Sequence, residues 1–328
     1  MFDVYKPSGG IGVKTYPLIL VGIPLAIALA FVYQLLLEWI PLIYISFLIT
    51  IGMGTGLAMI GSFIVNKGHV RNVMFAGLIG LILATCGLGA KYWFQYRTLL
   101  DAATTQLIQE NKLPETGRAE IKKQVSTTLT FAKHIEFRTE TGWSIGRGGG
   151  GAPVKGPFVY LVWLIEAGMI YYFAVKLPIG AAGQPYSEKM SMWADESNAV
   201  MTLPITDGEM VSKIKSASSV EQLLEIPIPK TDASNQFAVY TVNSIPGEEL
   251  EDAYLSVNLI TLSVNAKGEQ ETKDDPLVKL AILSTEKRKQ LIENAELLQE
   301  AMADFRASLE EEKEVAADAD VEQADETQ

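Results

Sequence analysis

The chain has 328 residues, of which 48% are hydrophobic and 20% charged, and its formal net charge is −12. This charge is unevenly divided: residues 1–177 hold 15 Lys and Arg against 9 Asp and Glu, whereas residues 178–328 hold 12 against 30. The acidic C-terminal half argues against nucleic acid as a partner, because phosphate contacts need concentrated Lys and Arg. The single cysteine, Cys86, excludes an intrachain disulfide and a multi-cysteine zinc site.

Four apolar runs are long enough to cross a bilayer, whose hydrocarbon core of about 30 Å needs about 20 helical residues. The runs are 17–37, 42–65, 70–90 and 157–177. The first three hold no charged residue except Arg71, on the rim of the third, and the fourth holds Glu166 near its middle and Lys176 at its end. We therefore expect an α-helical membrane bundle of four transmembrane helices, with a three-span block in residues 1–90 and the fourth span in residues 157–177.

Small residues recur every fourth position within the first three runs, a spacing that lets helix backbones approach closely. The series are Gly22, Ala26 and Ala30; Gly52 and Gly56; and Ala76, Gly80 and Ala84.

Basic residues beside the runs predict the orientation. Six fall on one side and four on the other: Lys6, Lys14, Lys67, Arg71, Lys176 and Lys189 against Lys91, Arg97, Arg147 and Lys155. Because the side richer in Lys and Arg is normally cytoplasmic, we expect both termini in the cytoplasm and the plasma (inner) membrane as the location.

Residues 91–156 are then an external helical hairpin followed by a Gly-rich joint. The third span is expected to continue as a helix as far as Pro114, and a second helix to occupy residues 116–134. The joint, 146–151, formally contains GxGxxG, but it runs through prolines into an apolar span, which does not suit a nucleotide. We interpret it as a flexible joint whose Arg147 and Lys155 are free to meet lipid headgroups.

The C-terminal region is predicted to be a linker, 178–206, a small soluble α+β domain, 207–310, and a disordered acidic tail, 311–328. β-branched and aromatic residues indicate strands at 237–245, 254–264 and 277–283. The apolar phase of the second strand switches from odd to even positions, which predicts a bulge near Leu259–Ile260. A helix over residues 285–309 carries a coiled-coil-like seam that we expect to pack on the domain's own strands.

The sequence offers few combinations of side chains that could catalyse a reaction or bind a metal ion. His69 and His134 fall on opposite sides of the membrane in this topology, so they cannot share a metal ion or pair with Cys86. We expect no enzymatic activity, no cofactor and no metal.

Glu166 is the one suggestive residue, because a charged group at the centre of a span costs about 3 kcal/mol on insertion scales. Three interpretations are open. A protonated Glu166 donates a hydrogen bond to Thr50, Thr55, Thr85 or a backbone carbonyl; a partner helix or subunit supplies the acceptor; or Glu166 lies on an ion or proton pathway. We favour the first, which predicts that Glu166→Gln is tolerated.

The sequence therefore favours a non-enzymatic, multi-pass membrane protein that anchors a cytoplasmic α+β domain in the bilayer for contact with a protein partner or for self-association. The alternative is a small oligomeric transport unit coupled to protons or ions through Glu166.

Overall fold

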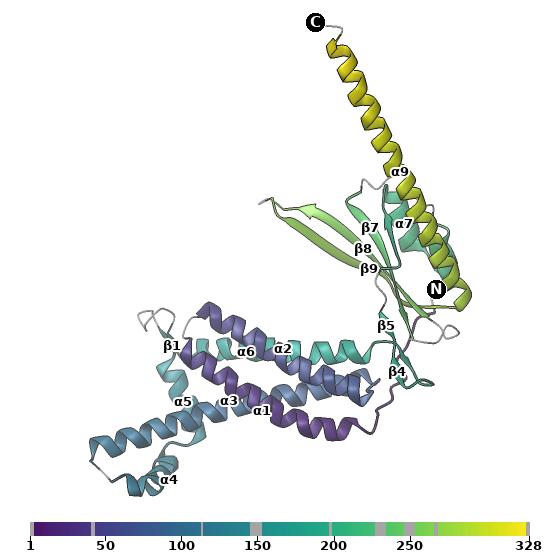
Figure 1. Cartoon of the computed structure of the whole chain (residues 1–328). Helices are drawn as coiled ribbons and strands as arrows, with labels where there is room; N and C mark the ends of the chain where they lie inside the picture. Colours follow the sequence, from purple (N-terminus) through teal and green to yellow (C-terminus); the bar gives the residue numbers. More distant parts are fainter. Residues whose placement is uncertain are drawn as a thin grey trace. The chain divides into compact units, whose positions relative to one another are not determined.

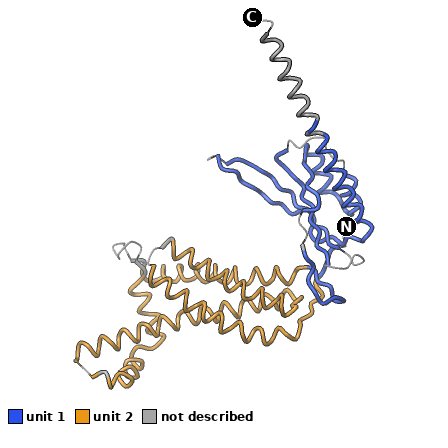
Figure 2. The backbone as a smooth tube through the Cα atoms, in the orientation of Figure 1, with its two compact units in different colours: residues 1–6, 185–328 blue, residues 7–184 orange. Residues whose placement is uncertain are grey.

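The computed structural model describes the whole chain except residues 1–2, 41–42, 113, 145–152, 197–198, 227–233, 246–252, 266–267 and 326–328. The chain forms two compact units, coloured separately in Figure 2. The first contains residues 7–184. The second contains residues 185–328 together with the N-terminal residues 1–6.

The first unit is built on four long helices, and each is long and apolar enough to cross a membrane, as predicted. Figure 1 labels them α1 (Thr15–Trp39), α2 (Ile43–Gly68), α3 (Val73–Glu110) and α6 (Pro157–Ala182). Small residues mediate their contacts, since Ala26, Ala30 and Ala84 are fully buried. A Cβ atom added to Gly80 would collide with the carbonyl of Ala174, so α3 and α6 touch through their backbones. Gly52 makes no such contact, because a Cβ atom there would meet nothing within 4 Å.

The hairpin that follows α3 contains three shorter elements, η1 (Glu115–Gly117), α4 (Arg118–Thr128) and α5 (Phe131–Thr141). The prediction of one helix over residues 116–134 is therefore wrong. Thr130 explains the break, because its backbone is extended and its side chain accepts a hydrogen bond from the Lys133 amide, which caps α5. After α5, β1 (Trp143–Ser144) pairs with β2 (Pro153–Val154) and so joins the two ends of the Gly-rich segment.

The second unit contains an antiparallel sheet in the order β5-β7-β8-β9, with β6 also paired to β7. Its strands are β5 (Asp195–Glu196), β6 (Met201–Pro204), β7 (Gln236–Ser244), β8 (Ala253–Val264) and β9 (Gln270–Leu283). These confirm the three predicted strands. β9 begins seven residues early, because its first residues are charged and exposed and carry no apolar signal.

Residues 178–206, predicted to be a linker, are largely structured. α6 runs on to Ala182, β3 (Tyr186–Ser187) pairs with β4 (Met192–Trp193), and β5 and β6 belong to the sheet. Met201 and Leu203 are buried in the core of the second unit. Strands of two to four residues are too short to show an alternation that sequence reasoning could detect.

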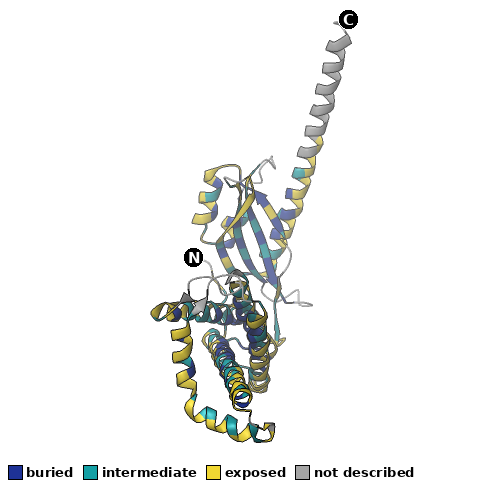
Figure 3. Ribbon diagram, turned by 90° about the vertical axis from the view of Figure 1, so that its left-hand side faces the viewer, coloured by how far each residue is buried: buried dark blue, intermediate teal, exposed yellow. Residues whose placement is uncertain are grey.

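Helices cover one face of the sheet, where the buried residues gather (Figure 3). They are α7 (Gly208–Ser216), α8 (Val220–Leu224) and α9 (Thr285–Asp325). Leu291, Ala295 and Leu298 of α9 are buried in this core, which confirms that the seam packs within the unit. The helix α9 continues to Asp325, past residue 310, where the acidic tail is predicted to begin; its added turns are rich in Ala and Glu, which favour helix.

The bulge expected near Leu259–Ile260 is also misplaced. β8 pairs with β7 without interruption, and the irregularities lie between β8 and β9, around Val257. The pairing of β8 with β7 keeps its register through the later even positions of β8, which are partly or largely exposed. Leu262 and Val264 consequently remain 42% and 68% exposed.

The N-terminal residues belong to the second unit because they pair with the edge of β9. The Ile282 amide donates to the Asp3 carbonyl at 2.7 Å, and the Tyr5 amide donates to the Leu280 carbonyl at 2.9 Å. The Tyr5 ring also meets the Tyr254 ring edge to face, with centroids 5.1 Å apart. Residues 3–5 therefore act as a short strand added to this edge.

Candidate functional site

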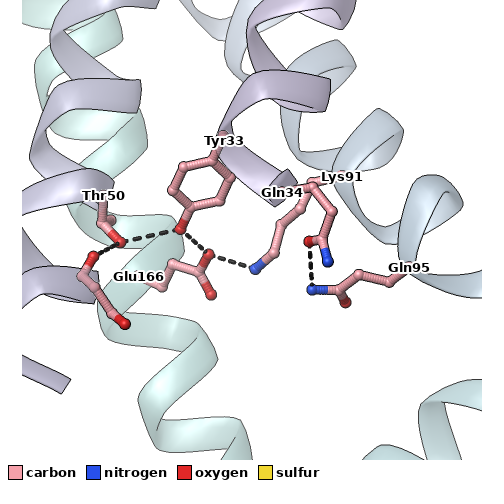
Figure 4. A network of polar contacts seen from close by, with 7 residues as sticks. Tyr33, Gln34, Thr50, Lys91, Gln95 and Glu166 are labelled. Atoms are coloured by element: carbon pink, nitrogen blue, oxygen red, sulfur yellow. Dashed lines mark hydrogen bonds and ion pairs between the residues drawn. The ribbon is translucent and has the colours of Figure 1, made fainter. Parts of the chain in front are cut away.

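Each of the four long helices supplies one polar side chain to a hydrogen-bonded layer inside the bundle (Figure 4). The members are Tyr33 of α1, Thr50 of α2, Lys91 of α3 and Glu166 of α6. Tyr33, Thr50 and Lys91 are buried. The layer therefore connects all four helices through side chains that are buried or, for Glu166, mostly buried.

Lys91 and Glu166 form the charged centre of this layer. The Lys91 Nζ donates to Oε1 of Glu166, and the side chains are only 4% and 14% exposed. The Nζ atom also lies 5.5 Å from the ring centroid of Tyr33 and 4.7 Å from that of Tyr92, which adds cation–π contacts. A buried pair of this kind cancels its own charge, whereas either member alone would be a buried, uncompensated ion.

Tyr33 links the ion pair to α2. Its hydroxyl donates to Glu166 Oε1 at 2.6 Å and lies 3.0 Å from the Thr50 hydroxyl, which also reaches the Ser46 carbonyl at 2.8 Å. A tyrosine hydroxyl has one proton, and the carboxylate is its strongest acceptor. The Thr50 hydroxyl also has a single proton, which it can donate either to the Tyr33 hydroxyl or to the Ser46 carbonyl. The series of hydrogen-bonded groups ends at the Ser46 carbonyl.

A second polar string lies beside the first. Gln95 Nε2 donates to the side-chain Oε1 of Gln34 at 2.9 Å, and Gln34 Nε2 donates to Oε1 of Glu38 at 2.8 Å. Gln34 follows Tyr33 in α1, and Gln95 lies one turn after Lys91 in α3. Because Glu38 is exposed while Gln34 is buried, this string runs from the surface of the first unit toward the ion pair.

The layer is displaced toward one end of the bundle. Tyr33 lies six residues before the end of α1, and Glu166 nine residues after the start of α6, which correspond to about 9 and 13 Å at the rise of an α-helix. Thr50 lies seven residues, or about 10 Å, from the start of α2. These three helix ends adjoin the hairpin and the connection from α1 to α2, so the polar groups gather on that side.

The structure thus gives Glu166 partners other than those the sequence suggested. Thr50 is reached only through Tyr33, and Thr85 bonds instead to Tyr171 at 3.0 Å. The sequence does not identify Lys91 as a member of the layer, because it directly follows the apolar run and has the position of a cation flanking a span. The available signal was Gln95 one turn later, which shows a polar stripe continuing along α3.

The other two predicted site residues are not part of this layer. Lys155 is exposed between β2 and α6, and Arg147 lies outside the described residues. No contact links Lys155 to Glu166 in the part of the chain that the structure describes.

The two histidines lie at different ends of the first unit. His134 is 2% exposed in α5, and the Tyr96 ring centroid is 6.0 Å away. Its ring nitrogens have no hydrogen-bond partner among the described residues. Burial, reinforced by the charge of Arg138, lowers the pKa of His134. His69 lies in the α2–α3 turn, before the start of α3, whereas His134 lies after the end of α3. Within the described ranges no group of three or more His, Cys, Asp or Glu side chains is placed to hold a metal ion.

No protein-family model, curated protein or solved structure matches the chain. Two structural features bear on function. A hydrogen-bonded layer with a neutralised ion pair connects the four long helices, and a separate folded unit contains residues 1–6 and 185–328.

Proposed function

We propose that the chain is a multi-pass integral membrane protein whose four long helices anchor and present the second unit as a non-enzymatic interaction module. Four helices of suitable length and composition support the membrane assignment. The buried layer supports a structural bundle, because the acid that a transport pathway would use is occupied by Lys91 and Tyr33. The partner is a protein, either of another kind or a second copy of this chain.

The observation that carries this proposal is the pairing of residues 3–5 with β9. The chain passes from the second unit into the first at residue 7 and returns to the second unit after residue 184. The second unit is thereby held through two separate connections. A module that only trailed from the last span would need one, so the double attachment favours a domain held for presentation.

The shared unit also supports placing both termini on one side of the membrane, as an even number of spans requires. We infer that this side is the cytoplasm and the membrane the plasma (inner) membrane, from the excess of flanking Lys and Arg. Reporters fused after Gln328 and inserted near Asn111 test the topology. The first is expected to be active only as a cytoplasmic reporter and the second only as an external one; the reverse pattern contradicts the orientation.

The alternative is a small oligomeric unit coupled to protons or ions through Glu166. The polar string from Glu38 to Gln95 favours it, because it leads from the surface toward the ion pair. The layer itself gives it less support, because its hydrogen bonds end at the Ser46 carbonyl, which lies on the same side of the bundle as Glu38. Transporters normally place their sites at the midplane between repeated halves.

One pair of experiments separates the two functions. A proximity-labelling enzyme on the full chain in native membranes should mark a partner set that is lost when residues 185–328 are replaced by an unrelated soluble domain. The same set should persist when Lys91 and Glu166 are both replaced by Met. In liposomes of the purified chain we expect no pH-gradient or ion flux above the background of empty vesicles. Flux that disappears in Glu166→Gln, in protein of unchanged folding, would establish the alternative.

A further inference from the structure

The outer edge of the sheet in the second unit is only partly covered. β9 is the last strand of this sheet, and the N-terminal arm pairs with it only at Leu280–Ile282. In residues 270–275, which we name the free edge, every residue is exposed, and among the described residues β8 is the only strand paired with them. Alternate amides and carbonyls of the free edge therefore point away from β8 and are available for pairing.

The β8–β9 hairpin extends beyond the end of β7 (Figure 1). β7 pairs with β8 as far as Thr261, whereas β8 and β9 stay paired as far as Val264 and Gln270. Two-stranded ribbons are only marginally stable in water, and this one leaves Leu262 and Val264 42% and 68% exposed. A strand added beside the free edge would complete a three-stranded sheet here, with half of its side chains on the same face as Leu262 and Val264.

The N-terminal arm shows that β9 accepts an added segment at this edge. The Ile282 amide donates to the Asp3 carbonyl, and the Tyr5 amide donates to the Leu280 carbonyl. The arm comes from a distant part of the sequence and pairs antiparallel with β9. The free edge continues the same strand beyond the arm, so an extended peptide can be added there through the same kind of backbone hydrogen bonds.

The charges of the free edge indicate the chemistry of the added strand. Glu271 and Asp275 lie on one face of β9 with Lys273 between them, and Asp274 lies on the other face, where its carboxylate accepts from Asn258 at 3.4 Å. Like charges opposite each other are destabilising, so this acidic edge disfavours pairing with a second copy of itself. It favours a segment whose basic residues lie opposite Glu271 and Asp275.

The other face of the added strand has different neighbours. The odd residues of the free edge carry the charges of one face, whereas Gln270 and Thr272 pair with Val264 and Leu262 on the other. Side chains alternate between the faces of a strand, so apolar residues would fall on the face of Leu262 and Val264. Pro276 has no amide hydrogen and sets the limit of the pairing at the other end.

We propose that the free edge binds an extended peptide segment of a partner protein, with two basic residues four positions apart on one face and apolar residues on the other. The basic side chains pair with Glu271 and Asp275, and the apolar ones share the face of Leu262 and Val264. The inference rests on the proposed interaction module and names its binding surface and the chemistry of its partner.

A blocked peptide of the sequence Lys-Val-Thr-Val-Lys-Val is the probe, with the full chain in detergent. It should slow hydrogen exchange in the free edge and leave α9 unchanged. Fluorescence anisotropy of the labelled peptide gives the affinity, which should fall about 2- to 25-fold in the Glu271→Gln, Asp275→Asn variant, because each exposed ion pair contributes a factor of about 1.4 to 5. The matched control is Glu293→Gln with Glu296→Gln, which changes two exposed carboxylates of α9 and gives the same net charge.

Two further peptides test the pairing. The peptide with Glu in place of both Lys residues should bind more weakly, and the peptide with Pro in place of the second Val should not protect the free edge, because it lacks a backbone donor. Absence of protection by the first peptide, unchanged affinity in the Glu271→Gln, Asp275→Asn variant or an equal loss in the control variant overturns the proposal. A dimer of the full chain that the peptide dissociates would show that a second copy occupies the free edge, and also overturns it.

Proximity labelling in native membranes separates this inference from the proposed function. A partner set that persists after residues 185–328 are replaced contradicts the interaction module itself. A set that is lost on that replacement but fully kept in the Glu271→Gln, Asp275→Asn variant leaves the module in place and rejects the free edge as its binding surface.

Discussion

The Nζ atom of Lys91 in α3 donates to Oε1 of Glu166 in α6, and this pair is the only charged contact among the described residues in the interior of the bundle. Glu166 is near the middle of an apolar helix and Lys91 directly follows the apolar run of another. A charged side chain at either position would be costly in free energy if it faced lipid. Because the two charges meet, each offsets part of the cost of burying the other, and the contact joins α3 to α6.

Removing one member of the pair should therefore be much worse than removing both. We expect Lys91→Met to destabilise the first unit by about 3–5 kcal/mol, since it leaves a buried carboxylate without a counter-charge. Lys91→Met combined with Glu166→Met should recover most of that loss. Thermal unfolding in detergent measures both. Lys122→Met is the control, because the Lys122–Asp101 pair is partly exposed and worth at most about 1 kcal/mol.

Glu166→Gln is now expected to be harmful, contrary to what a protonated Glu166 would give. The amide keeps the size of the side chain and can still accept from Tyr33, but it leaves the Lys91 ammonium buried without a negative partner. The unfolding temperature of Glu166→Gln should fall nearly as far as that of Lys91→Met. A variant as stable as the wild type would mean that Lys91 is neutral in the folded protein.

The sequence predicts the elements whose signals are local. Apolar length identifies the four long helices, β-branched residues identify β7 and β8, and the seam of Leu291 and Leu298 predicts how α9 packs. These features follow from periodicity and composition within one segment. The same local signals fail where polar residues such as Thr130 interrupt a pattern that otherwise continues.

The candidate site could be predicted only in part, because its decisive contacts join distant residues. Glu166 is visible as an acid in an apolar run, but its pairing with Lys91 depends on which helices are neighbours. The pairing of Asp3 and Tyr5 with β9 is similar, since three residues of extended chain carry no strand signal of their own. Such contacts depend on how distant segments pack in the fold, so they cannot be predicted from the periodicity of one segment.

The hairpin should lose stability as pH falls, because His134 is buried in its neutral form. Its pKa in the folded protein is lowered by burial and by Arg138, so between that pKa and the unfolded value near 6.5 the unfolded state binds more protons. The stabilising contribution is complete above about pH 6.5 and is lost below it. Hydrogen exchange of α5 at pH 7.5 and 5.5, corrected for intrinsic rates, should show this loss. His134→Phe should abolish the pH dependence, whereas His69→Phe should leave it in place.

Leu298 should be a stability determinant of the second unit and should not mediate self-association. It is 4% exposed in the core formed by α9 and the sheet, so Leu298→Ala should cost about 2–5 kcal/mol of unfolding free energy. Leu297, the next residue, is 51% exposed and provides the control, for which we expect almost no change. Denaturant unfolding and light scattering of residues 185–325 measure the two properties. A wild-type fragment that dimerises, and that Leu298→Ala converts to a folded monomer, would contradict the packing within the unit.

The N-terminal arm should protect the edge of β9 from hydrogen exchange. The Ile282 amide donates to the Asp3 carbonyl, so deletion of residues 2–6 removes its acceptor and leaves the amide open to water. A backbone hydrogen bond is worth about 0.5–1.5 kcal/mol net, which corresponds to an increase of about 2- to 12-fold in the exchange rate. The Val239 amide, in the middle of β7 between β6 and β8, is the internal control and should exchange at its original rate. Tyr5→Ala should give a smaller increase at Ile282, because it keeps the backbone bonds and removes only the ring contact with Tyr254. Unchanged exchange at Ile282 after the deletion would show that the arm does not hold the second unit, and the argument for a doubly attached module would then fail.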